Sequence, residues 1–208
     1  MRKSIFLLVL MVMCGSMQAK KIQLPKYNPQ LAGNMTLMQA LQERHSVREY
    51  QEKDIPDDVL STLLWAACGV NRPQDNRITA PSAMNAQDVM LFVCRADGYY
   101  RYCAKENCLE KLGNEDLRPS VGGRQSFVAT APVCLVMASD IGKFPHPVKE
   151  LGASDCAYVS QNVCLAAVAL GLATVPRASM DKDKLSKAFG LKDNQILFLN
   201  NPVGYPKK

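Results

Sequence analysis

The segment from Ser154 to Leu170 constrains the fold of this chain more than any other stretch. Apolar residues recur in it at intervals of three or four, which predicts one apolar face of an α-helix formed by Cys156, Val159, Val163, Ala166 and Leu170. Other apolar residues extend that face nearly all round the helix, namely Ala157, Cys164, Ala167 and Val168. A helix of this character is buried on most sides, either in a core or against a partner subunit.

Two nearly continuous apolar runs predict buried strands. Val89 to Arg95 and Val133 to Ala138 are long enough for strands and too apolar for a sheet face in water, so we expect both to be central. Asp97-Gly98 is a hairpin signal, and Tyr99 to Cys103 is the expected returning strand. A short strand is predicted at Ala173 to Pro176 and a final strand at Gln195 to Val203.

Helix signals occur at three further places. Thr36 is the expected N-cap of a helix that runs through Leu41. Asp54 as a cap, Pro56 in the first turn and the acids after it predict a helix from Asp57 to Cys68 that ends at Gly69. The last helix is predicted from Asp181 to Phe189.

Two polar stretches separate these elements. Gly69 to Ser82 is a long loop rich in turn formers, and a loop of this length in a compact domain is more often functional than idle. Ala104 to Gly123 is interpreted as a charged excursion that forms a solvated face or a flexible cover. The mixed order of strands and helices predicts an α+β sandwich in one domain, residues 36–208, preceded by an extended N-terminal arm, residues 20–35.

The first nineteen residues have the pattern of a secretory signal peptide. Arg2 and Lys3 form a positive start, and an apolar run from Ile5 to Met13 follows. We expect cleavage after Ala19 and export, which in a bacterial cell means the periplasm. The alternative is lipid attachment at Cys14. The apolar run is too short to serve as a stable transmembrane anchor.

Charge and cysteine usage exclude some classes of function. The formal charge of +6 is not gathered into a run or stripe with aromatic residues, so nucleic-acid binding has no support and small anionic ligands fit better. The chain has no Cys-x-x-Cys pair and only two histidines, so a metal site is not expected. Removal of the leader with Cys14 leaves an odd number of cysteines, of which Cys103 and Cys108 are close enough in sequence to be bridged.

The stretch Arg44-His45-Ser46-Val47-Arg48 is a candidate phosphate site. In an extended backbone Arg44, Ser46 and Arg48 point the same way, because side chains in a strand alternate with a period of two. Two guanidiniums offer planar forks to phosphate oxygens and the serine adds a neutral donor. Taken alone, the motif can equally be a solvated basic surface.

Together with three later segments, this motif resembles the FMN-dependent nitroreductases, and within them the branch that includes the oxidases of azoline-forming peptide synthetases. The resemblance runs from about Met38 to Pro206, and its landmarks appear in the family's order. They are Arg44 to Arg48, Leu64-Trp65-Ala66-Ala67-Cys68-Gly69-Val70-Asn71-Arg72, Thr79-Ala80-Pro81-Ser82-Ala83-Met84-Asn85-Ala86-Gln87, and Gln161-Asn162-Val163-Cys164-Leu165-Ala166-Ala167 through Thr174.

The resemblance implies a dimeric α-β-α sandwich with a mainly antiparallel central sheet and an FMN site at each subunit interface. It implies that the FMN phosphate is held by Arg44, Ser46 and Arg48, with His45 as a spacer and Lys207 as a further contact. From the partner chain it implies contacts by Pro81, Ser82, Ala83, Asn85 and Gln87. The flavin ring is expected beside Pro176, Arg177, Ala178 and Ser179, with a backbone N–H near Ala178 directed at the reacting ring nitrogen.

The implied function is electron or hydride transfer from a reduced donor such as NAD(P)H, through FMN, to a nitro compound, quinone or other small acceptor. The flavin performs the chemistry, so no catalytic side chain is assigned. One departure concerns Arg177, because relatives often have an acid in this segment; the arginine could favour a reduced anionic flavin or point into solvent. Alternatives are a flavin-binding or flavin-scavenging protein without turnover and a peptide azoline dehydrogenase.

Overall fold

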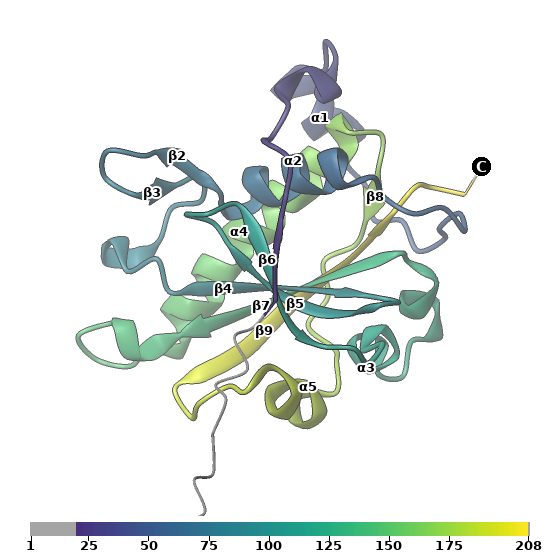
Figure 1. Ribbon diagram of the computed structural model, residues 1–208. Helices are drawn as coiled ribbons and strands as arrows, with labels where there is room; N and C mark the ends of the chain where they lie inside the picture. Colours follow the sequence, from purple (N-terminus) through teal and green to yellow (C-terminus); the bar gives the residue numbers. More distant parts are fainter. Residues whose placement is uncertain (1–19, 208) are drawn as a thin grey trace, which may run out of the picture.

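A seven-stranded sheet runs through the centre of the computed structural model, which describes residues 20–207 (Figure 1). Every neighbouring pair of its strands is antiparallel. Across the sheet the order is β1 (Lys21–Gln23), β6 (Cys108–Gly113), β5 (Gly98–Cys103), β4 (Val89–Arg95), β7 (Val133–Asp140), β9 (Gln195–Gly204) and β8 (Ala173–Thr174). The expected leader and its cleavage site lie outside the described residues.

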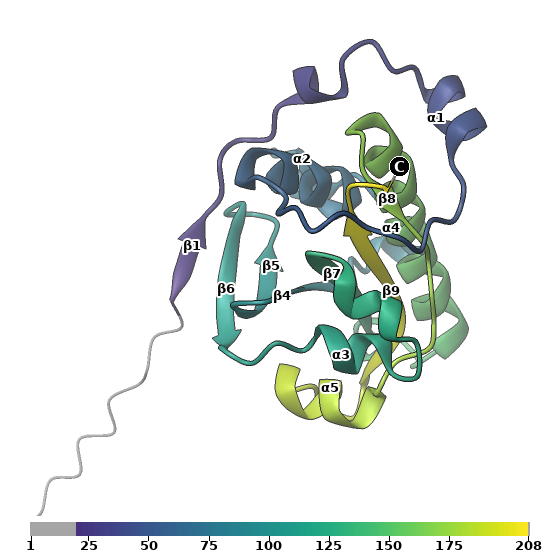
Figure 2. The same ribbon diagram turned by 90° about the vertical axis from the view of Figure 1, so that its right-hand side faces the viewer.

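Helices cover both faces of this sheet, as Figure 1 and Figure 2 show. On one face lie α1 (Leu37–Glu43), α2 (Asp57–Cys68) and α4 (Lys149–Ala169), and on the other α3 (Arg118–Gly122) and α5 (Lys182–Phe189). Short connections complete the fold, namely η1 (Pro29–Ala32), η2 (Ala83–Asn85), η3 (Ser126–Thr130), η4 (Ile141–Lys143) and the small hairpin of β2 (Val70–Arg72) and β3 (Arg77–Ile78). The predicted α+β sandwich with a central antiparallel sheet is confirmed.

The central strand β4 shows why the sheet needs cover on both sides. Leu91 and Val93 point into the core under α2 and α4, whereas Phe92 and Cys94 point into the core under α3 and α5. All four are at most 2% exposed. Phe92 also stacks on Phe189 of α5 with ring centroids 4.1 Å apart. Burial of each large apolar side chain stabilises the fold by about 1.5–3 kcal/mol, which explains the continuous apolar run.

The predicted apolar helix is α4, which begins five residues earlier than expected, at Lys149. Cys156, Val159 and Val163 are fully buried in the core, and Ala166 and Leu170 pack against it partly buried. The opposite side of the helix is open in this chain. Its largest apolar side chain, Tyr158, is 49% exposed.

The starts of α1 and α2 agree with the sequence signals, apart from the capping role of Asp54. Thr36 and Gln39 form the reciprocal capping box of α1. The predicted bounds of α2 are correct, but the N-cap is Pro56, which has no side-chain acceptor, so the prediction that Asp54 caps the helix is wrong. Asp57 and Asp58 occupy the first turn, where their charge complements the helix dipole.

The interpretation of Ala104 to Gly123 as a charged excursion is wrong, because the stretch contains β6 and α3. Cys108 and Leu109 of β6 are buried, whereas Glu110 and Lys111 are only partly covered near the edge of the sheet. A strand in this position needs few apolar residues, so its sequence lacks the usual pattern.

The N-terminal arm is tied down rather than free. Its strand β1 pairs with β6, and Tyr27 stacks on Trp65 of α2 with ring centroids 3.8 Å apart. The backbone N–H of Asn28 donates to the Thr62 hydroxyl at 3.0 Å. Within residues 20–207, no helix has the length and apolar character to cross a bilayer.

Candidate functional site

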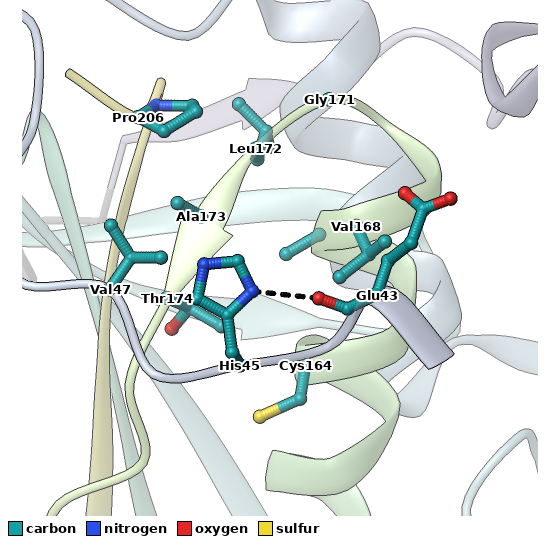
Figure 3. Close-up of a pocket in the computed structure, with 11 residues that line it drawn as sticks. Glu43, His45, Val47, Cys164, Val168, Gly171, Leu172, Ala173, Thr174 and Pro206 are labelled. Atoms are coloured by element: carbon teal, nitrogen blue, oxygen red, sulfur yellow. Dashed lines mark hydrogen bonds between the residues drawn. The ribbon is translucent and has the colours of Figure 1, made fainter. Parts of the chain in front are cut away.

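The predicted phosphate motif is an extended segment laid beside β8. Arg44 ends α1 with φ −59° and ψ 116°, and the Val47 N–H donates to the Thr174 carbonyl at 3.1 Å. Glu43, His45 and Val47 line a cavity of about 440 Å³ between this segment, the end of α4 and β8 (Figure 3). Because extended side chains alternate, the residues between them face the other way.

The face of the extended segment that points away from the cavity carries the predicted phosphate contacts Arg44, Ser46 and Arg48. Ser46 and Arg48 are exposed and Arg44 is half-buried, so their polar groups are open to a ligand. His45 lies on the opposite face, where its Nδ1 is 2.8 Å from the Glu43 carbonyl oxygen. This position agrees with His45 as a spacer and not with a contact to the same ligand.

The C-terminus joins the motif through backbone hydrogen bonds. The Lys207 N–H donates to the Glu49 carbonyl at 3.1 Å, and Tyr50 forms a β-bridge with Pro206. The buried Tyr50 hydroxyl donates to the Val47 carbonyl at 2.9 Å, and burial raises the pKa of this phenol. The backbone of Lys207 therefore lies beside Glu49, the residue that follows Arg48.

The side chain of Arg177 does not point into solvent. Its side chain is only 8% exposed and donates within the protein, to Gln125 and Asn200 at 2.7 Å, to the Val121 carbonyl at 3.1 Å and to the Gly122 carbonyl at 3.0 Å. Burial lowers the pKa of its guanidinium. The expectation of a solvent-directed side chain is wrong, and the arginine instead ties β9 to the end of α3.

The residues on either side of Arg177 are open. Its backbone N–H and C=O both pair with Asn200, at 2.8 and 2.7 Å, and this directs Pro176 and Ala178 outward. Ser179 is also exposed. Within residues 20–207 the Ala178 N–H donates to no other group. An unpaired donor therefore lies at the surface, in the segment predicted to approach a flavin ring.

The segment predicted to reach a partner's flavin, Pro81 to Gln87, is held in an unusual backbone conformation. Met84, Asn85 and Gln87 all have positive φ, at 52°, 54° and 46°. This left-handed region is unfavourable for residues with a Cβ, so surrounding contacts must hold it. One such contact is the Gln87 N–H donating to the Ser82 hydroxyl at 2.9 Å, and another is Lys143 Nζ donating to the Gln87 carbonyl at 2.7 Å.

A buried carboxyl pair anchors the start of this segment. Both Asp155 oxygens accept from the Ala83 N–H, at 3.0 and 2.9 Å. Asp155 is 1% exposed and Asp88, beside it, is fully buried and accepts from the Ser139 hydroxyl. Among the described residues no hydrogen-bond donor reaches the other Asp88 oxygen. Burial, then the hydrogen bond with Asp88, raises the pKa of Asp155 to about 6.

Neither aspartate was predicted as a site residue. The available signal was a charged residue on an apolar helix face, since Asp155 lies one turn before Val159. A buried acid of this kind usually has a specific partner.

The two halves of the predicted site lie at opposite ends of α4. Asp155 anchors Pro81 to Gln87 near the start of the helix, and Thr174 anchors the phosphate motif just beyond its end. The helical rise from Asp155 to Ala169 alone is about 21 Å. In Figure 1, β3 and β8 accordingly lie on opposite sides of the molecule. One chain cannot bring both segments to the same ligand atoms.

Apolar side chains are exposed near these segments. On α1, which packs against α4, Leu37, Met38 and Leu41 are 64%, 72% and 45% exposed. Met84 is 63% exposed. The three exposed side chains on α1 make this helix a candidate interaction surface. As for metals, residues 20–207 contain no group of three or more His, Cys, Asp or Glu side chains placed to hold an ion.

Comparisons with known proteins agree with this geometry. Residues 41–205 match the sequence profile of the family described as "Nitroreductase family". A Methanothermobacter thermautotrophicus protein named "Putative NADH dehydrogenase/NAD(P)H nitroreductase" is 27% identical over 179 residues, which cover 83% of this chain and 78% of that protein.

Two crystal structures extend the comparison. A "putative nitroreductase" from Ralstonia eutropha JMP134 is 31% identical and superposes with a TM-score of 0.83, covering 92% of each chain. A "Putative NADH Oxidase" from Clostridium acetobutylicum is 26% identical with a TM-score of 0.60, covering 81% of this chain and 88% of the other.

Proposed function

This chain belongs to the nitroreductase family, whose members are oxidoreductases, and from that premise we propose that it is an FMN-dependent enzyme. We propose NADH or NADPH as the electron donor and a nitro compound, a quinone or a similar small organic molecule as the acceptor. Bound FMN supplies the redox chemistry, and the chain's own residues bind and orient it.

The observation that carries this proposal is that three segments with exposed residues, Arg44 to Arg48, Pro176 to Ser179 and Lys207, are held near one another by β8 and by backbone hydrogen bonds. Arg44, Ser46 and Arg48 present two guanidiniums and a hydroxyl. The backbone bond between Lys207 and Glu49 adds Lys207 beside the end of this segment. The positive charge of Arg48 also contributes to the lowered pKa of Arg177, after burial, so the two guanidiniums lie near each other. The arrangement suits a ligand with a dianionic phosphate and a neighbouring planar ring.

Residues near Arg177 suit the ring end of that ligand. Pro176, Ala178 and Ser179 form an exposed ribbon, and the unpaired Ala178 N–H can donate to a ring nitrogen. The guanidinium N–H groups of Arg177 already donate to Gln125, Asn200 and two backbone carbonyls. We therefore assign it to holding the ribbon rather than to direct contact with the flavin.

We further propose that a second copy of the chain completes each site. The separation of the two half-sites along α4 supports this proposal, because a Pro81 to Gln87 segment from another subunit could reach the flavin held by the first. A two-fold dimer through the exposed side of α4 and the apolar residues of α1 would bury Met38 and Tyr158. In such a dimer the same surface of both subunits forms the interface, so each residue contributes once from each subunit. Asn85 and Gln87 would then provide amide groups to the partner's flavin.

Purified protein tests the proposal directly. The protein should be yellow or become yellow with added FMN, and anaerobic NADH or NADPH should bleach the flavin absorption. Reoxidation by a quinone or a nitroaromatic compound should restore it. A flavin that binds tightly but responds to neither donor would instead identify a flavin-binding protein without turnover. Failure to retain or take up FMN would overturn both interpretations.

We also propose export of the chain, on the leader sequence alone. Export would place the enzyme away from the cytoplasmic NAD(P)H pool, so a response to chemical reductants or reduced quinols belongs in the same assay. N-terminal sequencing of the protein isolated from its native cells would distinguish cleavage after Ala19 from lipid attachment at Cys14.

A further inference from the structure

Two thiols lie directly opposite each other at the end of the β5–β6 hairpin. Cys103 is the last residue of β5, Cys108 is the first of β6, and the two are register partners. Opposite residues in antiparallel strands have Cα atoms about 4.5 or 5.5 Å apart, inside the range of about 4.4–6.8 Å that disulfides span. A bond between these sulfurs therefore requires no rearrangement of the strands.

Solvent reaches one of the two thiols. Cys103 is half-buried and lines a cavity of about 520 Å³, whose wall also contains Arg101 and Lys105. Cys108 is 1% exposed and lies behind it. The chain contains a second cross-strand pair in the same register relation, Cys94 opposite Cys134, but both of those residues are fully buried in the core.

We propose that Cys103 and Cys108 are a redox-active dithiol, which small-molecule disulfides oxidise to a cross-strand disulfide by entry at Cys103. The cavity wall carries three cations, Arg101, Lys105 and Lys143, against one carboxylate, Glu106, and this excess of positive charge favours a disulfide that carries carboxylates, of the glutathione type. Cys94 and Cys134 stay reduced because no oxidant can reach them. This inference does not depend on the proposed flavin chemistry.

The reaction is two successive thiol–disulfide exchanges. The Cys103 thiolate attacks one sulfur of the oxidant, so a bond from Cys103 to glutathione forms and one glutathione thiolate leaves. The Cys108 thiolate then attacks Cys103 Sγ, the mixed disulfide breaks and the second glutathione thiolate leaves. The protein loses two electrons and two protons, which reduce one oxidised glutathione to two thiols.

The surroundings of Cys108 explain this order of events. Burial, followed by the charge and the thiol hydrogen bond of Cys103, raises the pKa of Cys108 to about 11, so it is a poor first nucleophile. Once Cys103 is bound to glutathione it carries no charge. That contribution to the raised pKa then disappears, whereas the larger contribution from burial remains. Cys108 completes the second step because it lies directly opposite Cys103 and the reaction is intramolecular.

Oxidation would affect the N-terminal arm, because the hairpin tip holds it. Asn107 Nδ2 donates to the Pro25 carbonyl at 2.8 Å, and the Leu24 N–H donates to the Asn107 carbonyl at 3.2 Å. Gln23 Nε2 donates to the Glu106 carbonyl at 2.9 Å. A disulfide across the base of this loop removes freedom from the unfolded chain and keeps the tip in place.

The experiment treats the full chain, with any flavin it retains, with excess oxidised glutathione at pH 8, followed by alkylation under denaturing conditions and tryptic peptide mass analysis. Cleavage after Lys105 separates the two cysteines. The expected product is therefore a reducible link between peptide 102–105 and peptide 106–111. Cys94 and Cys134 should be recovered alkylated. The oxidised protein should melt about 4 °C higher than the reduced protein, a difference that dithiothreitol removes.

Two variants test the roles of the thiols. Cys108→Ser should stop at the mixed disulfide on Cys103, and Cys103→Ser should leave Cys108 alkylatable with no glutathione adduct. Full recovery of alkylated Cys103 and Cys108 from the treated wild-type protein would overturn the proposal. Equal oxidation of Cys94 and Cys134, or a glutathione adduct on Cys108 in Cys103→Ser, would also overturn it, because access would then not select the site.

Discussion

Asp155 of α4 accepts the backbone N–H of Ala83 with both of its carboxylate oxygens, at 3.0 and 2.9 Å. The contact connects residues 72 positions apart and fixes the start of a segment whose φ angles are unfavourable. A charged acceptor binds an N–H more strongly than a neutral one does. The central helix therefore holds in place the surface that we propose to face the partner's flavin.

Replacement of Asp155 should weaken both the fold and the site. Asp155→Ala leaves the buried Ala83 N–H without an acceptor, so the free energy of unfolding should fall by about 1–3 kcal/mol. FMN affinity should fall as well, because the Pro81 to Gln87 segment loses its anchor. Urea unfolding and flavin titration measure the two effects. Asp193→Ala, an exposed acid in the turn between α5 and β9, is the matched control and should change neither.

The carboxyl pair also predicts a pH dependence of stability. The pKa of Asp155 is raised from 3.8 to about 6, so the folded protein keeps a proton that the unfolded chain releases between these values. Stability from this group is therefore fully present below about pH 4, declines as the pH rises and is lost above about pH 6.

Urea unfolding of the wild-type protein and of Asp155→Asn, compared from pH 4 to pH 8, measures this effect. The difference between the two proteins should change by about 1–2 kcal/mol across the window, in the direction that penalises the wild type at higher pH. A difference that stays constant with pH would show that Asp155 does not hold the proton.

Loss of the two guanidiniums should release the cofactor. Arg44→Ala combined with Arg48→Ala removes charged hydrogen bonds of about 1.5–3 kcal/mol each, so the Kd for FMN should rise at least 100-fold. Fluorescence titration of apoprotein with FMN measures this change. Arg72→Ala, in the exposed strand β2, removes the same charge elsewhere and should leave the affinity unchanged. Equal affinity of the double variant and the wild type would remove the proposed phosphate site.

Charges on the apolar surface should separate the subunits. Met38→Glu and Tyr158→Glu place carboxylates where we propose that the second copy packs, and burial of an unpaired charge is strongly unfavourable. Sedimentation should show a dimer for the wild type and a monomer with reduced flavin content for the variants. Lys187→Glu on α5, across the sheet, is the control. A wild-type protein that sediments as a monomer while retaining FMN would contradict the shared site.

Local signals identified most of the elements. The bounds of β4 and α2 were predicted residue for residue, because an apolar run and a helix that begins after Pro56 and ends at Gly69 are short-range features. The capping box of Thr36 and Gln39 is equally local. The predictions of secondary structure failed where the position of an element in the fold, rather than a local sequence pattern, determines its residues. Strand β6 keeps charged residues because it lies near the sheet edge, and α3 has only five residues.

The candidate site, like the helices and strands, was predictable where it depends on residues close together in the sequence. The alternation at Arg44, Ser46 and Arg48 follows from extended backbone, and the position of Lys207 followed only from the family resemblance. The burial of Arg177 was not predictable, since its acceptors come from three other elements.

By itself, the sequence determined the order of helices and strands, the apolar character of α4 and the spacing of the phosphate motif, because these depend on neighbours a few residues away. Only the tertiary structure decided which distant groups meet. It placed Asp155 under Ala83, closed a hydrogen-bond shell around Arg177, and gave solvent access to Cys103 while enclosing Cys94 in the same register relation. These contacts join residues far apart in the sequence, so they depend on how all the elements pack together rather than on any local pattern.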